Sequence, residues 1–120
     1  MAVHADNRGM DAQRFLGLSR ACIAEVEDWL EGFDPDELDY TMTDGVVTLE
    51  FADGTRFVLN RQSGNHQMWF AAGVSAWHYD FDEASERWLD ARDGHALQDR
   101  LAAAVGEKLG RDVVWSNTGA

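Results

Sequence analysis

Residues 38–60 have the sequence LDYTMTDGVVTLEFADGTRFVLN, in which apolar and polar side chains alternate between two turn signals. A period of two is the pattern of a strand with one buried face. Asp44-Gly45 is a strong signal for a two-residue hairpin turn, and Ala52-Asp53-Gly54 marks a second tight turn. The stretch therefore predicts three antiparallel strands in succession, at residues 38–43, 46–51 and 55–60.

Helices are predicted on either side of a longer run of strands. Over residues 11–33 apolar residues recur at steps of three and four, and Gly32 with Pro35 ends that helix. Further strands are predicted at residues 67–71, 76–81 and 87–89. A second helix follows over residues 97–109. We expect an α+β fold: an antiparallel sheet of about five to seven strands, with the N- and C-terminal helices packed on one face and the other face open to water.

The chain of 120 residues has the length of one domain, which we expect at residues 11–115 between tails at 1–10 and 116–120. It carries 22 acidic and 10 basic residues. Eleven of the acidic residues, and no Lys or Arg, lie in residues 21–55, so the charge is localised rather than spread over the surface. This balance argues against a nucleic acid or an anionic membrane as partner, because both require clustered cations.

Cysteine usage and hydropathy indicate a soluble protein of a reducing compartment, and we expect a bacterial cytoplasmic location. Cys22 is the single cysteine, so no intramolecular disulfide or thiolate zinc cage can form. It lies on the apolar stripe of the first helix, which favours a buried, inert thiol. The first residues resemble no targeting peptide, and no apolar run has the length of a membrane span.

An acidic ridge begins in the last turns of the first helix. Glu27, Asp28 and Glu31 share one helix face, where the helix dipole and their mutual repulsion both oppose negative charge. We define the acidic ridge as these three residues together with Asp34, Asp36, Glu37 and Asp39. It could be a merely solvated face. Alternatively, it could bind cations weakly through carboxylate oxygens, or dock a basic protein surface.

Residues 60–71 have the sequence NRQSGNHQMWFA. If Met68 and Phe70 face the helices, the alternation places Trp69 and Gln67 on the open face, where an aromatic residue among amides can anchor a protein partner. The alternative is that Trp69 is a core residue and Met68 is exposed. The four histidines have no ligand spacing, and Trp29, Trp77, Trp88 and Trp115 are most simply packing residues. We find no nucleophile with a base, phosphate loop or dinucleotide motif.

The order of elements, the acidic helix and the NRQSGNHQMWFA block resemble the frataxin family, most closely its bacterial CyaY-type branch. The resemblance runs from about Phe15 to Leu109 and includes DGVVTLEF at 44–51, HYD at 78–80 and WLD at 88–90. It implies a sandwich of two helices on a sheet that binds Fe²⁺ and Fe³⁺ weakly on acidic residues.

The resemblance also implies a role in iron-sulfur cluster assembly, with a cysteine desulfurase (IscS-type) and a scaffold protein (IscU-type) as partners. Carried over by position, the iron and desulfurase face is Glu27, Asp28, Glu31, Asp34, Asp36 and Asp39. The sheet face for partner contact is Asn60, Gln62, Gln67 and Trp69, with His78 where the eukaryotic branch often has Arg.

The expected function is that of a non-enzymatic iron donor or regulator, and the sequence does not separate the two roles because the same carboxylates serve both. We expect a monomer, with a metal-dependent oligomer as the alternative. Ferroxidase or iron storage is an enzyme-class alternative, but a buried di-iron centre requires Glu-x-x-His pairs that the sequence lacks. A metal-independent acidic interaction module is the third hypothesis.

Overall fold

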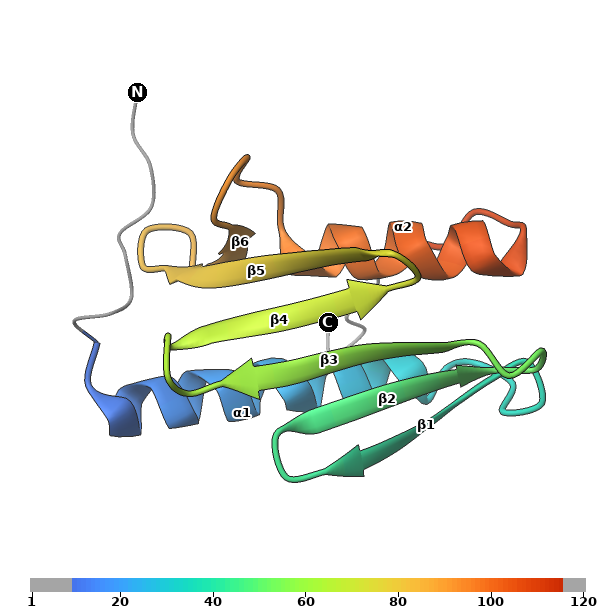
Figure 1. The fold of residues 1–120 in the computed structure, drawn as a ribbon, viewed down its shortest axis with the longest axis horizontal. Coiled ribbons are helices and arrows are strands. Elements are labelled where there is room, and N and C mark those ends of the chain that lie inside the picture. The colour runs from blue at the N-terminus through green and yellow to red at the C-terminus, as the bar shows by residue number, and fades with distance from the viewer. Residues whose placement is uncertain (1–9, 116–120) are drawn as a thin grey trace.

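A computed structural model describes residues 10–115, which form two helices and one six-stranded antiparallel sheet. The predicted tails lie outside the described residues except for Met10, which packs against the core. The elements, labelled in Figure 1, are α1 (Ala12–Leu30), β1 (Leu38–Thr43), β2 (Val46–Phe51), β3 (Arg56–Gln62), β4 (Gln67–Ala72), β5 (Ser75–Asp82), β6 (Arg87–Asp90) and α2 (Leu97–Leu109). Each strand pairs with the next along the chain, so the sheet is a simple meander from β1 to β6.

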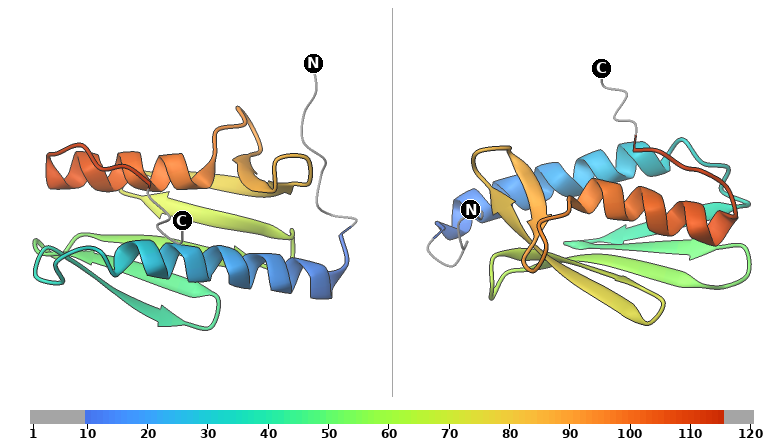
Figure 2. Two further views of the ribbon diagram at one scale, coloured as in Figure 1. Left: turned by 180° about the vertical axis from the view of Figure 1, so that it is seen from behind. Right: turned by 90° about the horizontal axis from the view of Figure 1, so that it is seen from above.

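The α+β prediction is confirmed, because both helices cover the same face of the sheet (Figure 2). Every second side chain along each strand points toward the helix layer. The middle strands β2, β3 and β4 contribute residues that are almost fully inaccessible: Val47, Leu49, Leu59, Met68 and Phe70. Helix α1 adds an apolar stripe that includes Phe15, Cys22 and Val26. Burial of this face is the main stabilising term, and it leaves the opposite face of the sheet open.

Helix α1 ends earlier than the predicted residue 33. Asp11 caps its start, with Oδ1 accepting from the backbone N–H of Gln13 at 2.6 Å. At the other end the backbone N–H groups of Gly32 and Phe33 bond three residues back, to carbonyls of Trp29 and Leu30, so the last turn tightens and the α-helix stops. The acidic residues that follow are therefore on a loop that leads into β1.

Strand β3 is longer than predicted. Arg61 and Gln62, expected in a loop, pair with Met68 and Gln67 of β4, and the turn closes over residues 63–66. His66, two residues after Gly64, adopts a positive φ of 53° there. The extension matters because it places the amide of Gln62 on the sheet, not in a loop.

The C-terminal segment after α2 returns across the helix layer. The Trp29 indole N–H donates to the Val114 carbonyl at 3.1 Å, and the rings of Trp29 and Trp115 lie 5.0 Å apart. Trp29 and Trp88 are buried, and Trp77 and Trp115 pack against the core, as expected for packing residues. Among residues 10–115, neither helix has the length and hydropathy needed to cross a bilayer.

Candidate functional site

The end of α1 and the start of β1 bring three carboxylates around one phenol. Tyr40, on the helix-facing side of β1, donates its hydroxyl hydrogen to Glu31. That hydrogen bond, burial, and the negative charges of Glu31, Glu27 and Asp28 raise the pKa of Tyr40 to about 12. The three helix acids of the predicted metal site are therefore neighbours in the fold. Tyr40, which the sequence did not single out, joins them to the sheet.

The acidic residues between 21 and 55 divide into paired and unpaired carboxylates. Four of them pair with cations: Glu37 with Arg111, Asp44 with Arg61, Glu50 with Arg56 and Asp53 with Lys108. The other seven form no ion pair with any residue from 10 to 115: Glu25, and the six ridge residues Glu27, Asp28, Glu31, Asp34, Asp36 and Asp39. These six are the predicted metal residues, so the uncompensated negative charge is concentrated where the sequence placed the site.

Glu37 differs from the rest of the acidic ridge. Both of its carboxylate oxygens accept hydrogen bonds from Arg111, which hold the pKa of Glu37 below its usual value. Arg111 follows α2, so this pair ties the α1–β1 loop to the other helix. Glu37 therefore has a cationic partner, which no other ridge residue has among residues 10–115.

The outer ridge residues are spread out. Asp34 accepts the Asp36 backbone N–H at 2.9 Å, and Asp39 lies on the side of β1 opposite Tyr40. No three ridge carboxylates, among the residues described, bring ligand oxygens within 4.8 Å of one another. Such exposed oxygens fit hard or borderline cations but do not form a closed cage, so any cation would exchange readily.

Trp69 lies on the open face of the sheet, as predicted. Its neighbours in the chain, Met68 and Phe70, are fully buried, so the alternative with Trp69 in the core is wrong. The Trp69 ring stacks on the ring of His78, with centroids 4.1 Å apart and planes 12° apart. Asn60 is the cross-strand partner of Trp69 on β3, so these three residues form one row across β3, β4 and β5.

A second row of polar side chains lies beside this one. The Trp69 indole N–H donates to Gln67 Oε1 at 2.9 Å, and Gln67 Nε2 donates to Asp80 Oδ1 at 3.1 Å. Gln62 is opposite Gln67 in the sheet. The five predicted partner residues are thus contiguous: Asn60, Gln62, Gln67, Trp69 and His78. Asp80 orients Gln67 through this hydrogen bond. Sequence reasoning did not name Asp80 as a site residue, although its position two residues after His78 on β5 places both side chains on the same face of the sheet.

Arg61 holds this part of β3 against the helix layer. Its Nε donates to the hydroxyl of the buried Ser19 at 2.9 Å, and its side chain is 10% exposed. Gly45 leaves room for it, because a Cβ there would lie 2.7 Å from Arg61 Nη1. Since Arg61 points inward, the side chains of Asn60 and Gln62 point outward. Sequence reasoning missed Arg61, although a serine on the apolar stripe of α1 hinted at a buried polar contact.

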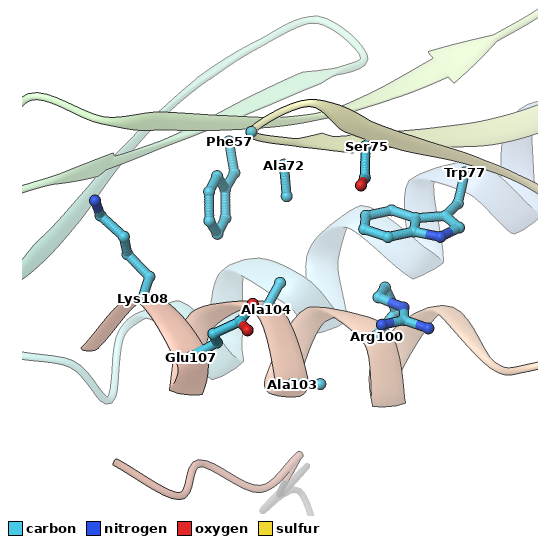
Figure 3. Close-up of a pocket in the computed structure, with 10 residues that line it drawn as sticks. Phe57, Ala72, Ser75, Trp77, Arg100, Ala103, Ala104, Glu107 and Lys108 are labelled. Atoms are coloured by element: carbon cyan, nitrogen blue, oxygen red, sulfur yellow. The ribbon is translucent and has the colours of Figure 1, made fainter. Parts of the chain in front are cut away.

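A groove of about 690 Å³ lies between α2 and strands β3 to β5. Figure 3 shows Phe57 and Trp77 on its sheet side, with Arg100 and Lys108 at its two ends. Arg100 lies 4.8 Å from the centre of the Trp77 ring, and Lys108 pairs with Asp53 at 2.5 Å. None of the predicted site residues lines this groove, so it is separate from both surfaces above.

Residues 8–111 match the family described as the frataxin-like domain. Similar curated proteins are named iron-sulfur cluster assembly protein CyaY. The protein from Dechloromonas aromatica is 33% identical over 106 residues, which cover 88% of this chain and 98% of that protein. The protein from Bordetella parapertussis is 36% identical over 87 residues, which cover 72% of this chain and 77% of that protein.

Solved structures agree with the sequence match. The frataxin of Psychromonas ingrahamii superposes with a TM-score of 0.79 at 28% identity, covering 89% of this chain and 99% of that one. A trimeric frataxin from Saccharomyces cerevisiae, complexed with ferrous iron, has a TM-score of 0.55 at 25% identity, covering 92% of this chain and 91% of that one.

Proposed function

The chain belongs to the frataxin-like family and functions in iron-sulfur cluster assembly, and we propose that it binds iron there as a donor to, or regulator of, a desulfurase-scaffold complex. The observation that carries the proposal is the set of six carboxylates at the end of α1 and the start of β1 that have no cationic partner within residues 10–115. Iron is cargo or effector in this role, not a resident catalytic cofactor.

Iron binding is proposed at the helix end first. Glu31 accepts a hydrogen bond from Tyr40, the charges of Glu27 and Asp28 also act on that phenol, and these three residues would supply oxygen ligands, whereas Asp34, Asp36 and Asp39 extend the negative potential along the surface. Oxygen ligands suit both Fe²⁺ and Fe³⁺ and select poorly against other hard cations. Weak binding of this kind suits delivery or sensing, because a delivered ion must leave again. The ferrous complex of the yeast frataxin supports iron as the cargo.

Two partner surfaces are proposed on the same chain. The ridge residues other than Glu37, which is paired with Arg111, would dock a basic surface of an IscS-type cysteine desulfurase by electrostatic attraction, which mainly raises the association rate. The Trp69 and His78 stack, with Asn60, Gln62 and Gln67 around it, would contact an IscU-type scaffold. An oriented aromatic ring among amides is the composition typical of an interface hot spot.

The proposed role is non-catalytic and bacterial cytoplasmic, and the proposed state is a monomer, with a metal-dependent oligomer as the alternative. The trimeric yeast frataxin supports an assembled form. Ferroxidase activity remains the alternative that the experiment must separate. It is recognised by oxidation of many Fe²⁺ equivalents per chain, whereas a donor binds a few ions and releases them.

The test uses two triple variants that remove the same charge. Glu27→Gln, Asp28→Asn and Glu31→Gln neutralise unpaired ridge acids. The matched control, Glu37→Gln, Glu50→Gln and Asp53→Asn, neutralises three acids that have cationic partners. Anaerobic Fe²⁺ titration and pulldown of the desulfurase-scaffold complex are measured for both variants and for the original chain.

The ridge variant should lose iron binding and desulfurase capture, and the control variant should keep both. Equal loss in the two variants would mean that only net charge matters and would contradict a localised site. Unchanged iron binding in the ridge variant would refute the assignment of iron to these carboxylates, and unchanged capture would refute their role in docking.

A further inference from the structure

A second group of ligand-bearing side chains lies where β6 leads into α2, far from the acidic ridge. Asp90, Asp93 and His95 bring one ligand atom each to within 4.8 Å of one another. The structure assigns to these three residues a binding site for a borderline divalent cation such as Zn²⁺ or Fe²⁺, independent of the ridge and of the role proposed above.

Asp90 supplies the first reason. Its side chain is 2% exposed, and Oδ1 accepts the backbone N–H groups of Arg92 at 2.7 Å and Asp93 at 3.0 Å. The other oxygen, Oδ2, is equally buried and has no hydrogen-bond donor among the described residues. A buried carboxylate oxygen without a donor is costly, and a cation is the partner that compensates it best. Oδ2 is therefore the oxygen of Asp90 left for a metal.

His95 supplies the second reason, because its ring is held on both sides. Nδ1 lies 2.6 Å from Asp93 Oδ1 and Nε2 lies 2.7 Å from the Tyr79 hydroxyl oxygen. A carboxylate can only accept here, so the ring proton is on Nδ1 and Nε2 accepts from Tyr79. A cation bound at Nδ1 would move that proton to Nε2, which would then donate to the Tyr79 oxygen. A ligating histidine oriented in this way through its other nitrogen is the usual arrangement in metal sites.

The ligand set defines the class of cation. Two carboxylates and one neutral imidazole balance a charge of +2, and the imidazole nitrogen favours Zn²⁺, Fe²⁺ or Co²⁺ over Mg²⁺ and Ca²⁺. Two guanidinium groups oppose a cation here: Arg92, with Nε 4.0 Å from Asp90 Oδ1, has a side chain that is 76% exposed and screened by solvent, and Arg100 acts on Asp93 and on Tyr79, the partner of His95. The ridge, with oxygen ligands alone, lacks this selectivity.

The position makes the two sites separable. The ridge adjoins β1 and the new site follows β6, which are opposite edges of a six-stranded sheet, roughly 24 Å apart at the usual strand spacing. The new site also joins β6 to α2 at a point where Ala96, the residue before the helix, makes no side-chain capping bond. A bound cation would therefore brace the start of α2.

The experiment follows the His95 tautomer by nitrogen NMR of the full chain, titrated with Zn²⁺ slightly above neutral pH. Asp93→Asn removes a ligand, and Asp99→Asn, an exposed carboxylate in the first turn of α2, is its matched control. The ridge variant Glu27→Gln, Asp28→Asn, Glu31→Gln is titrated in parallel, and excess Mg²⁺ is added to occupy oxygen-only sites.

Zn²⁺ should move the His95 proton from Nδ1 to Nε2. The affinity for Zn²⁺ should be at least tenfold weaker in Asp93→Asn. It should be unchanged in Asp99→Asn, in the ridge variant and in the presence of excess Mg²⁺. A His95 ring that keeps its Nδ1 proton at saturating Zn²⁺ would overturn the proposal, and so would undiminished affinity in Asp93→Asn. The tautomer measurement needs no substitution, so a poorly folded variant cannot obscure the result. Survival of the switch in the ridge variant separates this site from the proposed iron and desulfurase surface.

Discussion

Neutralising the helix end of the acidic ridge should make the fold more stable while removing its metal response. The change is Glu27→Gln, Asp28→Asn and Glu31→Gln, in the last turn of α1 and at its C-cap. Carboxylates there lie at the negative end of the helix dipole, and no basic residue offsets them in the last turn. The prediction is unusual in sign, since substitutions more often destabilise a protein.

The magnitude follows from three contributions. Relief of the unfavourable dipole interaction is about 0.5 kcal/mol for each carboxylate. Relief of the repulsion between Glu27 and Glu31, four residues apart, adds about 0.3 kcal/mol. Against this, the hydrogen bond from Tyr40 passes from a charged to a neutral acceptor, which costs about 1 kcal/mol. The net gain is about 1 kcal/mol, or about 4 °C in Tm for a domain of this size.

The assay is thermal and denaturant unfolding of three proteins, each with and without a divalent cation. The free energy of unfolding of the original chain should rise by about 1.4 kcal/mol at a cation concentration tenfold above Kd. That of the ridge variant should not rise through binding at the ridge. The variant with Glu37, Glu50 and Asp53 changed to amides should be less stable than the original, because it loses three ion pairs. A ridge variant that is less stable than the original would refute the reasoning, as would an equal shift in both triple variants.

Trp69→Ala should cost little stability but reduce scaffold capture, whereas Met68→Ala on the buried face should lose about 2–5 kcal/mol in denaturant unfolding; the reverse order would refute the assignment of faces. The pKa of Tyr40 is raised to about 12 chiefly by Glu31, so its contribution to stability is present below its ordinary pKa of about 10 and is lost as pH rises through 12. Burial also raises the pKa of Tyr79, the other tyrosine, so ultraviolet titration should show no tyrosine ionisation near pH 10, and Glu31→Gln should lower the pKa of one tyrosine, Tyr40. Burial raises the pKa of the Cys22 thiol far above its usual value, so thiol reagents should label it only as the chain unfolds; rapid labelling of the native protein would contradict this.

Much of the fold follows from local sequence patterns. The alternation around Asp44-Gly45 and Asp53-Gly54 predicts the first two hairpins, and both glycines have the positive φ that such turns need. The limits of β3 and α1 were wrong by a few residues, because pairing partners and the last helical bonds decide where an element stops. The sequence alone does not show which residues pair across strands or which backbone hydrogen bonds close the last helical turn.

The same division holds for the sites. The ridge was predictable because an excess of one charge over 35 residues is visible in any conformation, and the outward side of β4 was predictable from its period of two. Which acids are neutralised was not predictable, since Glu37 meets Arg111 across 74 positions of the chain. Likewise, His95 has no ligand spacing with another histidine in the sequence.

Periodicity and composition are enough to predict the class of fold, the location of the negative charge and the side of the sheet that carries Trp69. The three-dimensional packing was needed to show which carboxylates keep an uncompensated charge, how Gln67 and His78 orient Trp69, and that Asp90 has a buried oxygen without a donor among residues 10–115. Charge compensation and burial depend on contacts between residues distant in the chain, and those contacts exist only once the helices have packed on the sheet.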